Sequence, residues 1–161
     1  MLTLRTASPA DTDALQTLAH SIWNRVYPSI ISQAQIDFML GQMYSPAHIA
    51  AEMNAGYRWE WVEDDGVAIG YTSTLLEGNA LKVSKIYLEP SHHGKGCGQE
   101  ILRYLDTVAQ HAGAESIYLF VNRANQRAVK AYLRAGYEIV ATLDQPFGEF
   151  VLNDLKMSKS I

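Results

Sequence analysis

The sequence predicts an α/β fold in which a central, mixed but mostly antiparallel sheet is flanked by helices. Three observations support this class. The first third of the chain carries helical spacing, the next third changes to alternating strand patterns broken by turns, and the remainder alternates helix with strand. A chain of 161 residues has the usual size of one domain, so we expect a single domain over 1–161.

The opening third is predicted to hold one short strand and three helices. A strand at 3–5 precedes a helix over 9–25, which begins with the capping pattern Ser-Pro-Ala-Asp. Ser32 is the N-cap of a second helix, because a glutamine follows it three residues later. Ser45, followed by proline, starts a third helix that ends near Gly56.

The middle of the chain is predicted to form an antiparallel meander of three strands. Residues 59–63 alternate like a half-buried strand, and Asp-Asp-Gly at 64–66 is a hairpin turn signal. The chain returns over 67–76 and then forms a third strand over 81–88, which a proline stops.

A glycine-rich loop at 94–98 opens the last part of the chain. It leads into an amphipathic helix closed by Gly113, and the strand at 117–121 follows. A strand–helix–strand crossover makes this strand parallel to its neighbour. A helix over 125–135 comes next. The last elements expected are two strands at 137–143 and 149–157, joined by a loop that contains Pro146 and Gly148.

The composition argues against several classes of protein. With 48% hydrophobic residues and a net charge of −4, the chain is not a disordered protein. Its apolar runs fall short of the roughly 20 residues of a membrane span, and no signal pattern opens the chain. The acidic balance without a Lys/Arg cluster disfavours nucleic-acid binding. The single Cys97 fits a reducing compartment, so we expect a cytoplasmic protein.

The glycine-rich loop has the form of a phosphate-binding loop, since it lies between a strand and a helix. A nucleotide P-loop would need four residues between its glycines and a Gly-Lys-Ser/Thr ending, which is missing. A dinucleotide fingerprint would need Gly-x-Gly-x-x-Gly and an acid at the end of the next strand, and both are missing.

Two motifs instead resemble those of the GNAT acetyltransferase superfamily. His93-Gly94-Lys95-Gly96-Cys97-Gly98 is similar to the family's Gln/Arg-x-x-Gly-x-Gly/Ala loop. About thirty residues later, Asn125, Ala128, Tyr132 and Gly136-Tyr137 match the pattern Asn-x-x-Ala-x-x-x-Tyr-x-x-x-Gly-Phe/Tyr. The order of elements fits over nearly the whole chain, and it looks most like the bacterial small-amine and polyamine branch.

The resemblance implies acetyl-CoA as cosubstrate and gives each motif a role. Backbone groups of the strand before the loop would bind the pantetheine and the thioester, and the loop N–H groups would hold the pyrophosphate. Tyr132 would protonate the departing thiolate as a general acid. The cofactor-binding residues implied in this way are Ile86, Tyr87, Leu88, His93, Gly94, Lys95, Gly96, Cys97, Gly98, Gln99, Asn125 and Tyr132.

Two positions depart from the family pattern. His93 stands where Gln or Arg is usual and is expected to brace the loop. Phe120 occupies a position where some relatives carry a catalytic Glu, so the general base has to be another group or a water relay. Glu89 is the candidate we choose for the catalytic site, and Glu77 and Glu149 stay open as alternatives.

Several residues have a structural interpretation beside the functional one. Trp23 and Tyr27 are four residues apart on the first helix and are expected to line the acceptor groove, although most aromatic residues here belong to the core. Cys97 is expected to be a small buried hydrophobic residue rather than a nucleophile. Glu60 and the acidic residues after it are expected to be solvated, and no metal is expected because the histidines lack ligand spacing.

The sequence therefore predicts an N-acetyltransferase that moves acetyl directly from acetyl-CoA to a primary amine, such as a small amine or a polyamine. The alternatives are a protein N-terminal or lysine acetyltransferase and a non-catalytic acyl-CoA-binding module or sensor. Neither nucleic acid nor membrane is expected as a partner. A homodimer is a possible assembly, because dimers are common in this family.

Overall fold

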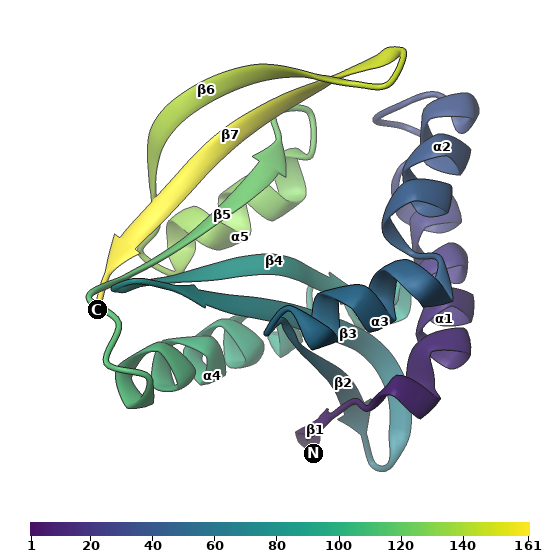
Figure 1. Cartoon of the computed structure of the whole chain (residues 1–161). Coiled ribbons are helices and arrows are strands. Elements are labelled where there is room, and N and C mark those ends of the chain that lie inside the picture. Colours follow the sequence, from purple (N-terminus) through teal and green to yellow (C-terminus); the bar gives the residue numbers. More distant parts are fainter. The chain divides into compact units, whose positions relative to one another are not determined.

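The structure, a computed structural model, describes all residues from 1 to 161. The chain divides into two compact units, one formed by Met1–Thr74 with Lys85–His93 and the other by Leu75–Ser84 with Gly94–Ile161. A seven-stranded sheet runs in the order β1-β2-β3-β4-β5-β7-β6, as the labels of Figure 1 identify the strands. The pairs β1–β2, β2–β3, β5–β7 and β6–β7 are antiparallel and the pair β4–β5 is parallel, which confirms the predicted class of a mostly antiparallel sheet.

The helices and strands follow the predicted order. In chain order they are β1 (Leu2–Thr6), the 3-10 helix η1 (Pro9–Asp11), α1 (Thr12–Val26), α2 (Gln33–Met43), α3 (Pro46–Asn54), β2 (Arg58–Asp64), β3 (Val67–Glu77), β4 (Ala80–Leu88), the 3-10 helix η2 (Pro90–His92), α4 (Cys97–His111), β5 (Ser116–Asn122), α5 (Gln126–Arg134), β6 (Glu138–Phe147) and β7 (Phe150–Ser160). No helix is long and apolar enough to cross a membrane.

Side-chain caps fix the predicted helix starts. The Ser32 hydroxyl accepts a hydrogen bond from the Gln35 N–H at 3.1 Å, and the Ser45 hydroxyl accepts one from the His48 N–H at 3.1 Å. Each cap satisfies an N–H group that the first helical turn leaves without a partner. The starts of α2 and α3 were therefore predictable from local sequence.

The first unit has an aromatic core against one face of β2, and the side chains on the other face of this strand are buried as well. Trp59 is 1% exposed and Trp61 is 4% exposed, but Glu60 between them is also only 1% exposed. The expectation of a half-buried strand with a solvated Glu60 was therefore wrong. Burial of this carboxylate is compensated by the Arg58 guanidinium, which lies 3.3 Å from it.

The second unit has a core made by α4, α5 and one face of β5 and β7 (Figure 1). The buried side chains of this core are Ile101, Leu102, Leu105, Ala109, Ile117, Leu119, Val121, Ala128, Tyr132 and Met157. Because side chains alternate along a strand, the intervening residues of β5 and β7 point to the opposite face. Phe120, on that opposite face, is 41% exposed.

The hairpin of β6 and β7 is longer than predicted. Pro146 was expected in a loop, but it belongs to β6 and pairs with Val151, and only Gly148 and Glu149 form the turn. A proline is compatible with this strand because β6 is the last strand of the sheet and has a neighbour on one side only. The loop expectation failed because sheet position, rather than local sequence, decides whether proline is tolerated.

Candidate functional site

The end of β4 carries the strand residues that were predicted to bind the thioester arm. Gly70 of β3 makes a very close backbone approach here, since a Cβ built on it would lie 2.1 Å from the Tyr87 carbonyl oxygen. The Glu89 N–H donates to the Ile69 carbonyl at 2.8 Å, beside an irregularity in the β2–β3 register. The absence of a side chain at Gly70 therefore allows the backbone of β3 to lie this close to the backbone of β4 at Tyr87.

The His93 side chain contacts the last residue of this strand, whereas it was expected to brace the glycine loop. Its Nε2 lies 3.0 Å from the carbonyl oxygen of Leu88. The neighbouring His92 instead interacts with the Asp64 carboxylate at 3.4 Å. Together with the N-terminal amine, this imidazole lowers the pKa of Asp64, the amine making the larger contribution. The two adjacent histidines thus have different partners.

The glycine loop forms a cradle in front of α4. Gly94 has φ 72° and Gly96 has φ 84°, values that L side chains rarely adopt. A Cβ added to Gly94, Gly96 or Gly98 would meet no heavy atom within 4 Å, so open space lies beside all three. The first N–H groups of the 15-residue α4 have no helical partners and lie at this end. The cradle therefore has the chemistry of an anion site, with the exposed Lys95 beside it.

The structure changes the prediction for Cys97 and leaves that for the Gln99 main chain open. Cys97 is half-buried at the first position of α4 and is not a fully buried core residue, because the helix start remains partly accessible. The Gln99 side chain donates to the Ala131 carbonyl at 2.9 Å and so ties α4 to α5. Only the main chain of Gln99 is then left to contribute to the cradle.

Asn125 is the N-cap of α5 and Tyr132 lies within this helix, as the second motif predicts. The Asn125 side chain caps the helix by accepting a hydrogen bond from the Ala128 N–H at 3.4 Å. Tyr132 is 8% exposed, and its ring lies 5.9 Å from the ring of Tyr137. Both residues therefore have a structural role, and their proposed contacts with a cosubstrate would be additional.

Trp23 and Tyr27 meet in the aromatic core of the first unit. Their ring centroids are 4.4 Å apart, and the Tyr27 hydroxyl lies 2.8 Å from that of Tyr87 on β4. Trp23 is only 1% exposed and donates its indole N–H to the Tyr71 hydroxyl at 3.2 Å. Tyr71 in turn donates to Tyr44 at 2.8 Å. Both predicted acceptor-binding residues thus contact Tyr87 on β4, Tyr27 through its hydroxyl group and Trp23 through its ring, whose centroid lies 5.5 Å from that of Tyr87.

The phenol groups of Tyr44 and Tyr71 in this aromatic core are too weakly acidic to take part in proton transfer. Burial raises the pKa of the Tyr44 and Tyr71 phenols well above their ordinary value. Both therefore remain protonated at neutral pH, and neither supplies a base. The hydrogen-bonded series from Trp23 to Tyr44 serves to satisfy buried polar groups.

A buried lysine beside these rings was missed by the sequence analysis. Lys85 is 3% exposed, and its ammonium group lies 3.5 Å from the Glu52 carboxylate. The same ammonium lies 4.9 Å from the centre of the Trp59 ring and 5.6 Å from that of Tyr44. His48 also approaches Glu52, at 3.3 Å. The only signal of Lys85 in the sequence was its position in β4, on the face that carries buried residues of this strand.

The three glutamates considered as general bases lie in different surroundings. Glu89 is paired with Arg25 at 3.5 Å, and Glu77 accepts a hydrogen bond from the Tyr118 hydroxyl. Glu149 is exposed in the β6–β7 turn. A different carboxylate, Asp154 on β7, is half-buried, and burial raises its pKa against the opposing effect of Arg123. The sequence analysis overlooked Asp154.

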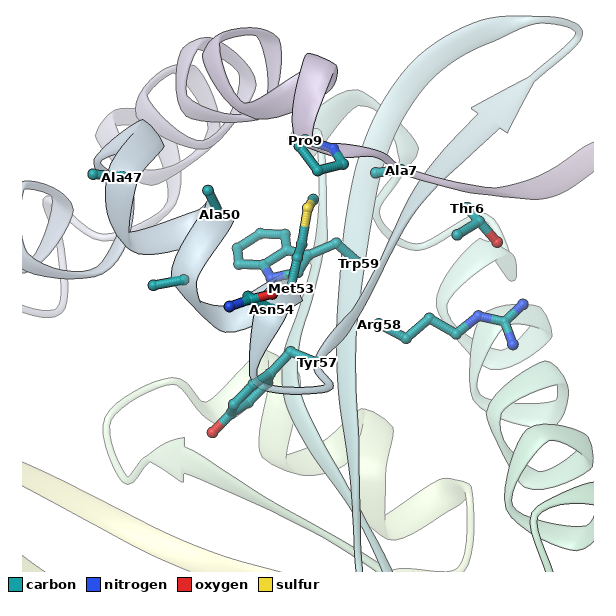
Figure 2. Close-up of a pocket in the computed structure, with 11 residues that line it drawn as sticks. Thr6, Ala7, Pro9, Ala47, Ala50, Met53, Asn54, Tyr57, Arg58 and Trp59 are labelled. Atoms are coloured by element: carbon teal, nitrogen blue, oxygen red, sulfur yellow. The ribbon is translucent and has the colours of Figure 1, made fainter.

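A pocket of about 790 Å³ opens in the first unit between α3 and the start of β2 (Figure 2). None of the residues predicted for the site lines it. The indole N–H of Trp59, which lines the pocket, is buried without a hydrogen-bond partner. The lining residues are Thr6, Ala7, Pro9, Ala47, Ala50, Ala51, Met53, Asn54, Tyr57, Arg58 and Trp59.

Comparisons with known proteins agree with the motifs. An uncharacterized N-acetyltransferase of Mycobacterium tuberculosis is 32% identical over 99 residues, which are 60% of this chain and 63% of that protein. The L-amino acid N-acyltransferase MnaT of Escherichia coli is 28% identical over 104 residues, 62% of this chain and 60% of that protein. The matched regions thus span less than two thirds of these relatives.

The fold also has close counterparts among solved structures. The PaiA N-acetyltransferase of Thermoplasma acidophilum, solved in complex with coenzyme A, matches with a TM-score of 0.83 at 20% identity, covering 100% of this chain and 99% of that one. Residues 19–137, which include the glycine loop and α5, match the family described as the Acetyltransferase (GNAT) family. This protein therefore belongs to the GNAT acetyltransferase family.

Proposed function

We propose that this protein transfers the acetyl group of acetyl-CoA directly to the primary amine of a small molecule. The observation that carries the proposal is the cradle of Gly94, Gly96 and Gly98 at the N-terminus of α4, in a chain of the GNAT family. The cradle fits a pyrophosphate, because its glycines leave open the space that side chains would fill and its N–H groups are free to donate.

The residues that the family motifs point to would have separate roles in binding and catalysis. Main-chain groups of Ile86 to Leu88 would bind the pantetheine and the thioester carbonyl, on a strand that Gly70 and His93 hold in place. Donors aimed at a carbonyl oxygen stabilise the negative charge that develops when an amine attacks. Tyr132, at the far end of α5 from Asn125, would give a proton to the leaving thiolate.

A small acceptor is favoured by the relatives and by the aromatic surroundings of Tyr27. The Escherichia coli relative is an L-amino acid N-acyltransferase, so one of the most similar curated proteins acts on a small amine. Tyr27 and Tyr87 place two hydroxyl groups at the edge of the aromatic core, where they can orient an amine. The free thiol of Cys97 supports a cytoplasmic location, where thiols stay reduced.

The activity is tested by measuring release of the CoA thiol from acetyl-CoA across a panel of acceptors. The panel contains polyamines, amino acids and amino-bearing antibiotics, with peptides carrying a free N-terminus or a lysine as a separate arm. Turnover with one small-amine class is the expected result. Turnover with peptides alone would show a protein acetyltransferase, and CoA binding without any turnover would show a non-catalytic binder.

The cradle is tested separately by two substitutions at one position. Gly98→Ala adds a methyl group to open space in the first turn of α4, and we expect unchanged CoA affinity. Gly98→Asp places a negative charge at the same point, which suits the helix N-terminus but repels a pyrophosphate. We expect Gly98→Asp to weaken CoA binding at least tenfold in calorimetry without lowering the melting temperature. Equal affinity of the two variants would show that the pyrophosphate does not bind here.

A further inference from the structure

The C-terminal turn of α1 lies beside the end of β4, the strand proposed to bind the thioester arm. Arg25 of this turn lies 3.5 Å from the carboxylate of Glu89, which directly follows β4. The hydroxyl of Tyr27, the C-cap of α1, lies 2.8 Å from the Tyr87 hydroxyl. The two contacts are two residues apart on both segments, so the four side chains are neighbours. They form a polar cluster that belongs entirely to the first unit.

The guanidinium group of Arg25 is held in place by its own helix. Its Nε donates to the Ser21 carbonyl at 3.2 Å, and its Nη2 donates to the Ser21 hydroxyl at 3.1 Å and to Glu89 at 3.5 Å. The Nη1 group has no partner within the chain, and the Arg25 side chain is 47% exposed. A side chain that is already ordered loses little conformational freedom when it binds an anion. Arg25 is therefore a preorganised and accessible donor.

Glu89 is the anionic group of the polar cluster. One of its carboxylate oxygens contacts Arg25, and the other has no partner within the chain. Its side chain is 28% exposed and can be reached from solvent. The contact with Arg25 is longer than the roughly 2.8 Å of a strong charge-assisted hydrogen bond, and accessible pairs of this kind contribute little to stability. Folding alone thus gives little reason for a fixed ion pair at this position.

The charges of the polar cluster discriminate between the classes of small amine. The cluster contains one cation and one carboxylate, and two phenol oxygens lie beside them. A polyamine carries cationic groups only, so Arg25 would repel it. A free α-amino acid carries an ammonium and a carboxylate one carbon apart, and these charges are complementary to Glu89 and Arg25. Each phenol oxygen can also accept a hydrogen bond from an ammonium group.

We propose that the acceptor is a free α-amino acid, whose carboxylate binds Arg25 and whose ammonium group lies at Glu89 before it loses its proton. The inference rests on the proposed function and names the substrate class of the same site. Because Glu89 directly follows Leu88, the last residue proposed to bind the thioester, the amino group is held at the end of that strand. Arg25 then determines specificity by binding the carboxylate and does not touch the reacting atoms.

The test compares leucine and phenylalanine with their carboxamides as acceptors of the wild-type protein. Each amide has the same side chain and an α-amine but lacks the carboxylate. We expect kcat/KM to be about tenfold higher or more for the amino acids, because a charged donor left without its acceptor costs a factor of this size. Spermidine should be a poorer acceptor than either amino acid. This comparison needs no variant, so its outcome does not depend on the folding of a mutant protein.

Arg25→Gln assigns the preference to the guanidinium group. The ratio of kcat/KM for amino acid and amide should fall about tenfold or more, mainly through a higher KM for the amino acid. Arg25→Lys retains the charge without the planar fork and should keep part of the preference. In both variants the CoA dissociation constant should stay within about twofold, since Arg25 is not among the residues proposed to bind CoA.

Arg5→Gln is the matched control, because it breaks a comparable pair, that of Arg5 with Glu63 at 3.0 Å between β1 and β2. It should keep the wild-type ratio. If the wild-type protein acetylates the amides or spermidine as well as the amino acids, or if Arg25→Gln keeps the wild-type preference, the inference is wrong while the proposed function stands. If the wild-type protein binds CoA but acetylates no amine, the proposed function is wrong and the inference falls with it.

Discussion

Replacing Gly70 by alanine should displace the end of β4, the strand proposed to bind the pantetheine, because it adds one methyl group. The new Cβ would lie 2.1 Å from the Tyr87 carbonyl oxygen and 2.9 Å from the Leu88 side chain, whereas real Cβ atoms essentially never come within 3.0 Å of another heavy atom. The nearest atom belongs to the main chain, so no side-chain rotation relieves the clash. One of the two strands has to move by about 1 Å, and such overpacking typically costs about 1–3 kcal/mol.

The effect on binding should exceed the effect on folding. Displacement of the Tyr87 carbonyl changes the main-chain groups proposed to bind the pantetheine, so we expect CoA affinity to fall at least tenfold. Urea unfolding followed by tryptophan fluorescence gives the loss of stability, and calorimetry below the unfolding transition gives the affinity.

Gly41→Ala is the control for Gly70→Ala. Gly41 lies inside α2, and a Cβ there meets nothing within 4 Å. This change should raise the free energy of unfolding by about 0.5–1 kcal/mol, since alanine is the better helix former, and should leave CoA binding unchanged. A Gly70→Ala protein with wild-type stability and wild-type CoA affinity would refute the close approach and the role of this strand.

Two further substitutions test the other parts of the structure. Tyr132→Phe removes only a hydroxyl group, so CoA affinity should hold while turnover falls by about 10²-fold, as expected when a general acid is lost; unchanged turnover would exclude Tyr132 as the acid. Lys85→Met leaves the partly buried Glu52 with His48 as its remaining partner, and it should lower the free energy of unfolding by about 3 kcal/mol in urea titrations. The double variant Lys85→Met, Glu52→Leu should recover much of that loss, and a double variant as unstable as the single one would contradict the charge-pair explanation.

Local signals made most of the fold predictable. Ser32 and Ser45 cap their helices as serines do, and Asp65 with Gly66 makes the turn between β2 and β3 through positive φ angles of 48° and 82°. The glycine loop and the α5 motif were equally predictable, because each combines a backbone requirement with a fixed spacing.

What the sequence could not predict depends on contacts between distant segments. Glu60 is buried because Arg58 pairs with it and both faces of β2 are covered, and neither fact is visible in an alternating strand pattern. Lys85 likewise became interpretable only through its contact with Glu52. The expectation of a single domain remains a prediction.

The outer strand β6 has a consequence for how copies of this protein can associate. Its outer edge is interrupted near one end by the register irregularity around Val140 and near the other by Pro146, which has no N–H group to donate. An incoming strand would find only a short uninterrupted stretch between them, and such interruptions protect edge strands from fusing with other sheets. We therefore expect the hairpin to resist fibril-like aggregation, and any homodimer to be held by side-chain packing rather than by a sheet continued across two chains.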